Sequence, residues 1–204
     1  CIGLDFGTTC SSIYVYNTQT NKPEARMNSQ PNAFIPTLIS FMENDNPVFG
    51  FDAEKTQNYV SDIKRTLGIT HDALRNKYSK NNKTIWDEEG IIMKSTESKL
   101  DMASKIKICD ENGNNERLNE QIAGKFIQWL VETVAGIEID LYLNVVITIP
   151  ADFTVNQRKA ILAAAKEAGF DDLNITLLHE PSAAAIVYFQ QPENADKSFE
   201  NLLV

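Results

Sequence analysis

The C-terminal half of this 204-residue chain alternates apolar strands with helices, which constrains the fold more than any other feature. The run Leu143–Ile149 is nearly all apolar and ends at Pro150, as expected of a strand covered on both faces. Leu173–Leu178 predicts a second buried strand, and Pro181 then suits the first turn of a helix. Strands that alternate with helices indicate an α/β fold.

Two helices in this half carry clear start and stop signals. Thr154 and Gln157 form a capping-box pattern, and the helix that they open is predicted to close at Gly169. An earlier amphipathic helix is predicted to end at Gly136. Its apolar positions recur at helical spacing, at Leu118, Ile122, Phe126, Trp129, Leu130 and Val134.

The N-terminal half is predicted to begin with two strands, Cys1–Phe6 and Ser12–Tyr16, joined by a bend at residues 7–10. Asp52 is predicted to cap a helix that begins at Ala53 and runs toward Tyr59. Between and after these elements we expect strands at Thr37–Phe41, Val48–Phe51, Ile91–Lys94 and Lys105–Cys109, and a helix at Thr70–Tyr78.

Composition excludes several classes of function. The chain has 28 acidic and 19 basic residues, a net charge of −9, and no basic stripe, so nucleic acid is not an expected partner. No apolar run approaches the roughly 18 residues of a membrane-spanning helix, so membrane insertion is not expected. The three cysteines are scattered and lack metal or redox spacing, which favours a reduced, cytoplasmic location.

The bend in LDFGTTCSS places polar groups directly after an apolar strand. Asp5 ends the strand and can hold a hydrated magnesium ion, while Gly7 lets the backbone approach a ligand closely. The amides from Gly7 to Cys10 and the hydroxyls of Thr8 and Thr9 can cradle a phosphate. The stretch matches neither the GxxxxGK[ST] nor the GxGxxG loop, and a plain hairpin with polar turn residues remains an alternative.

Several separate stretches together resemble the seventy-kilodalton heat-shock chaperone family, whose members are actin-like ATPases. IGLDFGTTCSS at Ile2–Ser12 is similar to the family's first phosphate loop. Val145–Gly169 is similar to its strand, proline and helix block, and Leu177–Tyr188 to its glutamate-proline-alanine signature. Phe49–Glu54 and Asp62–Gly68 match as well, in the expected order.

The resemblance implies roles for two charged residues that would otherwise be ordinary. Lys64 would reach the phosphates and orient the attacking water, with Arg65 as a structural neighbour. Glu180 would contact Mg²⁺ through water and sense the state of the nucleotide, ATP or ADP. Without the resemblance, Lys64 reads as a solvated side chain at a helix end and Glu180 as a helix N-terminal acid.

The resemblance also implies a relay out of the site. Pro150 and Arg158 match the proline and arginine that transmit the nucleotide state in the family. His179 departs from the usual asparagine, so a side-chain contact made by that amide is in doubt. Either the imidazole brings pH sensitivity, or only the backbone geometry matters at this position.

The family resemblance implies that the chain is the first lobe of an ATPase domain. We expect a ribonuclease-H-like subdomain at residues 1–36 and 117–204, with an inserted subdomain at 37–116. The second lobe and the peptide-binding domain are missing, and the chain begins and ends inside strand patterns, as an excised fragment would. Because half a cleft leaves the phosphates solvated, we expect the fragment alone to be inactive. The partners implied are extended peptides, bound through the missing domain, J-domain co-chaperones and nucleotide-exchange factors.

Two other functions fit some of these observations. A sugar kinase of the same superfamily also opens with an acid, a glycine and two threonines, although it should lack the DIKR and HEPSAAA stretches. A non-catalytic viral assembly or movement protein could keep the chaperone fold without turnover. LDFGTT, SDIKRTLGIT and IPADF are in fact similar to the divergent chaperone homologues of filamentous plant viruses.

Overall fold

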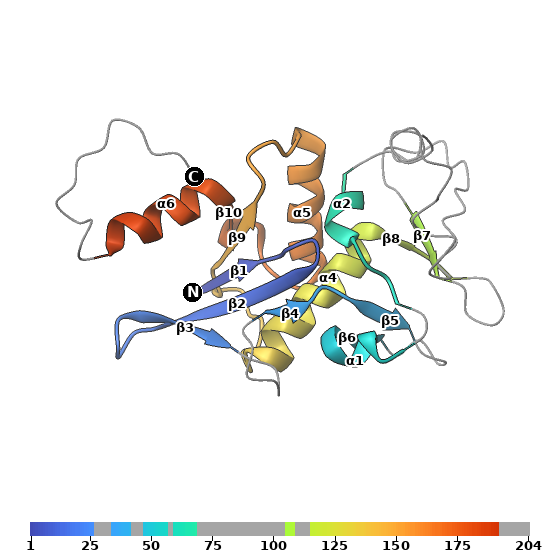
Figure 1. Ribbon diagram of the computed structural model, residues 1–204, viewed down its shortest axis with the longest axis horizontal. Coiled ribbons are helices and arrows are strands. Elements are labelled where there is room, and N and C mark those ends of the chain that lie inside the picture. The colour runs from blue at the N-terminus through green and yellow to red at the C-terminus, as the bar shows by residue number, and fades with distance from the viewer. Residues whose placement is uncertain (27–33, 42–46, 57–58, 69–104, 109–114, 192–204) are drawn as a thin grey trace.

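The computed structural model describes residues 1–26, 34–41, 47–56, 59–68, 105–108 and 115–191. Its centre is a six-stranded mixed sheet in the order β10-β9-β1-β2-β3, with β4 paired to β2 (Figure 1). β1, β9 and β10 run parallel to one another, whereas β2 is antiparallel to its neighbours β1 and β3. These strands are β1 Ile2–Asp5, β2 Cys10–Asn17, β3 Lys22–Arg26, β4 Ile35–Pro36, β9 Val145–Ile149 and β10 Ile175–His179.

One face of this sheet forms the core together with two helices. α4 Asn119–Trp129 and α5 Val155–Glu167 pack on each other closely, since a Cβ at Gly124 would lie 2.7 Å from Glu167 Cβ. The buried residues of β1 and β9 alternate with less buried ones, as the period of a strand requires. They include Ile2, Leu4, Val145, Ile147 and Ile149, and α4 and α5 contribute Ile122, Phe126, Ile127, Ile161 and Ala164.

The helix signals of the C-terminal half are confirmed. The Thr154 hydroxyl accepts from Gln157 N at 3.3 Å, and Gln157 Oε1 accepts from Thr154 N at 3.0 Å, so both halves of the capping box form. α4 continues as a π-helical turn, Leu130–Val134, and Gly136 follows it with a φ of 68°. α6 Glu180–Gln190 starts directly after β10 and extends away from α4 and α5 (Figure 1).

In the sequence between β4 and β9, β5 Ile39–Phe41 and β6 Pro47–Phe49 pair to form a smaller, separate sheet. α1 follows as Gly50–Glu54, so the prediction that Asp52 caps a longer helix toward Tyr59 is wrong. The N-cap is Phe49, which makes no side-chain cap bond but stacks on Trp129 with ring centroids 5.1 Å apart. Aromatic packing on α4, rather than a polar cap, therefore accompanies the start of this helix.

Several short elements were not anticipated, among them β3, β4, the four-residue helix α2 Ile63–Thr66, β8 Asn115–Leu118, and the 3-10 turn Asp172–Asn174, which includes Leu173 of the predicted strand. β8 pairs with β7 Lys105–Ile108, which confirms the strand expected there. The predicted helix at 70–78 and the predicted strand at 91–94 lie outside the described residues. The domain boundaries at 36 and 117 stay predictions. In the described ranges, no helix combines the length and apolar character needed to cross a bilayer.

Glu120 is a charged residue whose burial conflicts with ionisation. Burial raises the pKa of its carboxyl above 4.5, although hydrogen bonds with its own backbone and with that of Gly68 partly oppose this effect. Within the described part of the chain, its Oε2 atom is buried without a hydrogen-bond partner. Relative to the protonated form, the ionised form of this side chain is therefore less stable in the folded protein than in the unfolded chain.

We expect Glu120→Gln to stabilise the protein at neutral pH. Because the folded-state pKa is raised, the unfolded chain loses this proton first, and the stability of the wild type falls as pH rises through and above 4.5. Urea unfolding from pH 4 to pH 7 should therefore give a difference between variant and wild type that grows with pH. A difference that does not change with pH would contradict this account.

Candidate functional site

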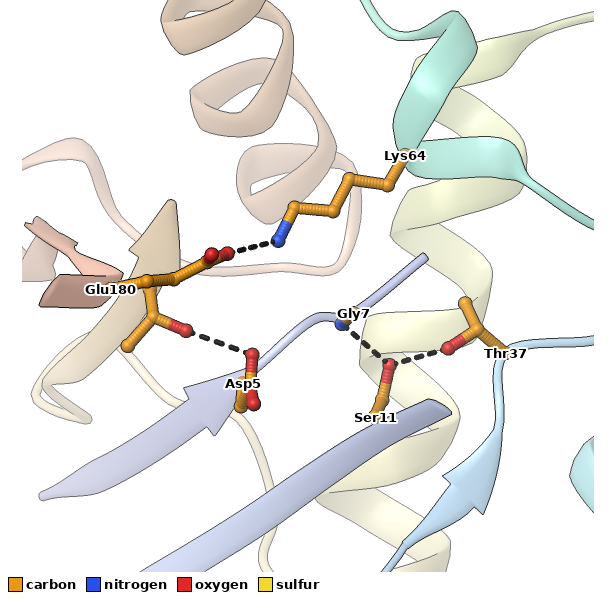
Figure 2. Close-up of polar contacts among 7 residues, drawn as sticks. Asp5, Gly7, Ser11, Thr37, Lys64 and Glu180 are labelled. Atoms are coloured by element: carbon orange, nitrogen blue, oxygen red, sulfur yellow. Dashed lines mark hydrogen bonds and ion pairs between the residues drawn. The ribbon is translucent and has the colours of Figure 1, made fainter. Parts of the chain in front are cut away.

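The bend between β1 and β2 is held by a small polar network (Figure 2). Gly7 N donates to Ser11 Oγ at 3.2 Å, and Ser11 Oγ lies 2.8 Å from Thr37 Oγ1. Thr37 N in turn donates to Thr9 O at 2.8 Å. Ser11 and Thr37 are fully buried, so these bonds fix the bend against the chain that follows β4.

Gly7 is required by the bend itself. A Cβ at this position would lie 2.0 Å from the carbonyl oxygen of Cys10 and 3.1 Å from its carbonyl carbon. The backbone thus turns back on itself within four residues, which brings successive main-chain amides close together. Beyond Gly7, Thr8 is half-buried, whereas Thr9 and Cys10 are exposed.

Asp5 lies at the end of β1 with its carboxylate exposed. Its Oδ1 accepts a hydrogen bond at 3.0 Å from the hydroxyl of Thr148 on the neighbouring strand β9. This bond orients the carboxylate, and among the described residues no hydrogen bond occupies its second oxygen, which can accept from a ligand. Asp5 is therefore an accessible acid in a defined orientation at the carboxyl end of parallel strands, where ligands of α/β sheets commonly bind.

Lys64 lies on α2, far from this sheet in sequence, and three contacts hold its segment in place. Val60 forms a β-bridge with Ile39 on β5. Asn119 Nδ2, at the start of α4, donates to Thr66 O at 3.3 Å. Gly68, with a φ of 63°, lies so close to α5 that an added Cβ would be 2.5 Å from the Asn156 backbone.

Lys64 and Glu180 form an ion pair between the α2 segment and the end of β10. Lys64 Nζ lies 2.7 Å from Glu180 Oε1, and in Figure 2 the lysine side chain extends from α2 toward the carboxylate. The lysine side chain is only 4% exposed, whereas that of the glutamate is 42% exposed. A buried ammonium needs such a counter-charge, because an unpaired one loses its hydration without compensation.

The two residues of the predicted relay, Pro150 and Arg158, are linked through the backbone of Phe153. Arg158 on α5 donates from Nη1 to His179 Nε2 at 2.9 Å and from Nε to Phe153 O at 3.1 Å. Pro150 directly follows β9, and its carbonyl accepts from Phe153 N at 3.3 Å. Among the described contacts, no hydrogen bond or ion pair joins Asp5 to Lys64 or Glu180.

The carboxylates of this site fit a hydrated metal ion better than a fully protein-ligated one. Mg²⁺ typically uses one or two carboxylates and keeps several waters, and the side chains of Asp5 and Glu180 are both accessible, each next to the end of a strand. In the part of the chain that the structure describes, no group of three or more His, Cys, Asp or Glu residues is arranged to hold a metal directly.

Sequence reasoning missed four residues that organise the site. Ser11 and Thr37 brace the bend, Thr148 orients Asp5, and Phe153 lies near Lys64. Ser11 was within the quoted motif, yet its partners lie 26 residues away or across the bend. A single sequence carries no signal for such pairings, because a serine or threonine whose hydroxyl is buried looks the same in the sequence as one whose hydroxyl is exposed.

Comparisons with known proteins give one family. The family model described as Hsp70 protein matches residues 1–199. The chain is 31% identical to a heat shock protein homologue of Encephalitozoon cuniculi, aligned over 100% of the chain and 32% of that protein. Heat shock 70 kDa protein 14-A of Xenopus laevis is 28% identical over 92% of the chain and 35% of its own length. Chaperone protein dnaK of Cyanidium caldarium is 26% identical over 96% and 30%. The chain thus spans about a third of the length of these relatives.

The close backbone approach at Gly7 generates a prediction with a matched control. Gly7→Ala should lower the free energy of unfolding by about 1–3 kcal/mol, because the new methyl group overlaps the Cys10 carbonyl. Gly3→Ala should change it by about 0.5 kcal/mol or less, since its nearest neighbour, Tyr14 Cβ, would be 4.0 Å away. Urea unfolding measures both, and equal effects of the two variants would contradict the described bend.

Proposed function

The chain belongs to the Hsp70 family, and from this premise we propose that it forms the first lobe of an ATP-binding, ATP-hydrolysing chaperone domain. The lobe would combine a ribonuclease-H-like subdomain, built on the mixed sheet, with an inserted subdomain. The observation that carries the proposal is the Lys64–Glu180 ion pair, which joins a distant segment to the strand ends beside the bend. None of the comparisons supports the sugar-kinase alternative.

In this proposal the bend binds the phosphates of ATP or ADP. The amides of Thr8, Thr9 and Cys10 and the two threonine hydroxyls are the donors, because the Gly7 amide is already bonded to Ser11 Oγ. Gly7 and Ser11 therefore shape the bend rather than contact the ligand.

Asp5 and Glu180 are the acids that would hold Mg²⁺ through water. The bound ion would supply charge neutralisation for the phosphate oxygens. The Thr148 hydroxyl keeps Asp5 oriented for this task. Glu180 additionally restrains Lys64, so one carboxylate is shared between the ion-binding and the catalytic groups.

Lys64 is the proposed catalytic residue. Its ammonium orients the attacking water and stabilises charge at the terminal phosphate, which a positioned cation can do in a site shielded from water. Its partner Glu180 holds the ammonium at 2.7 Å and keeps it directed toward the strand ends. The net effect is a lysine held ready at the site before substrate arrives.

Communication beyond the lobe belongs to the same proposal. Pro150 and Arg158 would pass the nucleotide state outward, since Arg158 joins the loop after β9 to the end of β10. Extended peptides, J-domain co-chaperones and nucleotide-exchange factors would then be partners of the whole protein, in the cytoplasm. A non-catalytic assembly role is the alternative that measurement of turnover would reveal.

Lys64→Ala, made in the protein at its natural length, should reduce the rate of ATP hydrolysis by on the order of a hundredfold. Nucleotide affinity, measured by calorimetry, should change far less, because the phosphate-binding amides remain. Lys55→Ala is the matched control, since that side chain is 74% exposed and pairs only with Asp52 among the described contacts. An unchanged hydrolysis rate in Lys64→Ala, with nucleotide still bound, would remove Lys64 from the mechanism.

The 204-residue chain by itself should hydrolyse ATP negligibly. One lobe leaves the phosphates in contact with water, where the electrostatic terms that accelerate phosphoryl transfer are weak. A phosphate-release assay on the purified chain, compared with the longer protein at equal concentration, tests this. Comparable turnover in the two samples would refute the requirement for a second lobe.

A further inference from the structure

Lys64 is part of a closed ring of contacts that includes two residues without an assigned role. Its ammonium is bonded to Glu180 at 2.7 Å, and Glu180 is the next residue after His179. His179 Nε2 lies 2.9 Å from Arg158 Nη1, and Arg158 Nε donates to Phe153 O at 3.1 Å. The aromatic side chain of Phe153 closes this ring of contacts, because the centroid of its phenyl group lies 5.9 Å from Lys64 Nζ.

The link between Arg158 and His179 has only one direction. A guanidinium group has no acceptor, so Arg158 donates and His179 Nε2 accepts. The accepting nitrogen therefore carries no proton in this arrangement, and the orientation of the imidazole is fixed by the arginine. Since His179 is joined by a peptide bond to Glu180, this bond also restrains the backbone that carries the acid.

Phe153 is held on both sides of its backbone. Its N–H donates to Pro150 O at 3.3 Å, and its carbonyl accepts from Arg158. The ring packs partly against the core. An ammonium within about 6 Å of a ring centroid is attracted by the ring's quadrupole, and the attraction grows when water is excluded. Lys64 meets this condition, because its side chain is almost fully buried.

We propose that Phe153 and His179 are positioning residues for Lys64. Phe153 supports the ammonium directly, and His179 acts through Arg158, which holds both the loop that carries Phe153 and the strand end that carries Glu180. Loss of either contact releases the ammonium toward solvent. The proposal concerns the placement of Lys64 and rests on the proposed function only for its consequence for hydrolysis.

Reductive methylation with formaldehyde and cyanoborohydride, followed by mass spectrometry, measures how accessible each lysine is in the protein at its natural length. Phe153→Leu keeps an apolar side chain but removes the ring, and His179→Ala removes the acceptor. In each variant, labelling of Lys64 should become about two- to fivefold faster, as loss of a cation–π contact implies. Labelling of exposed Lys55 should not change and serves as the internal reference.

Two further variants separate positioning from a general loss of structure. His179→Gln supplies an amide oxygen near the place of Nε2 and should restore the slow labelling of Lys64. Val155→Ala, at an apolar side chain that is 67% exposed on the same helix as Arg158, should label as the wild type does. The double variant Phe153→Leu/His179→Ala should label no faster than the quicker single variant, because both act on one contact ring.

Wild-type labelling of Lys64 in both single variants would overturn the proposal, as would additive effects in the double variant. ATP turnover measured on the same samples gives an independent readout. The positioning variants should lower kcat with little change in nucleotide affinity, and His179→Gln should recover kcat. If the wild type binds no nucleotide while the labelling pattern is as expected, the proposed function fails and the positioning of Lys64 stands.

Discussion

The contact on which the site depends is the ion pair between Lys64 and Glu180. A lysine side chain that is 4% exposed has lost most of its hydration, and the glutamate is the counter-charge that the fold supplies. The two residues are 116 positions apart, so their contact requires α2 and β10 to be correctly placed at once. The site therefore exists only as a product of the whole fold, which couples its chemistry to global stability.

Two parts of the surrounding structure position the residues of the site. The sheet sets where strands end, which places Asp5, the bend and Glu180 on one side, while Ser11 and Thr37 make the bend rigid through buried bonds. The segment at residues 59–68, anchored at Val60 and Thr66, brings Lys64 to this site. Arg158 binds the loop after β9 and the end of β10 together, which restrains the backbone next to Glu180.

Much of the fold follows from local sequence, because the signals involved are local. The capping box at Thr154 and Gln157 joins residues only three positions apart. The bend at position 7 is marked by a glycine, because a Cβ there would overlap the backbone of Cys10. Asp52 shows where such reasoning fails: its side chain suits a cap, yet the stacking of Phe49 on Trp129 accompanies an earlier helix start. The short helix α2 was missed because four residues carry almost no periodicity.

The sequence pattern indicated Asp5 and the bend, and the resemblance indicated Lys64, Glu180, Pro150 and Arg158, whereas the partners of these residues came only from the structure. Nothing in the sequence around His179 indicates that Arg158, 21 positions away, donates to its ring. Phe153 likewise reads as an ordinary apolar residue, although its ring lies 5.9 Å from the Lys64 ammonium. Contacts between side chains on different elements depend on tertiary packing, which one sequence does not encode in any short pattern.

A double-mutant cycle on the free energy of unfolding, with Lys64→Met, Glu180→Gln and the double variant, tests the central contact most directly. The account predicts that the two single changes are not additive, with a coupling energy of at least about 0.5 kcal/mol in favour of the native pair. Additive single effects, with no coupling beyond experimental error, would contradict the claim that the ammonium and the carboxylate meet in the folded protein.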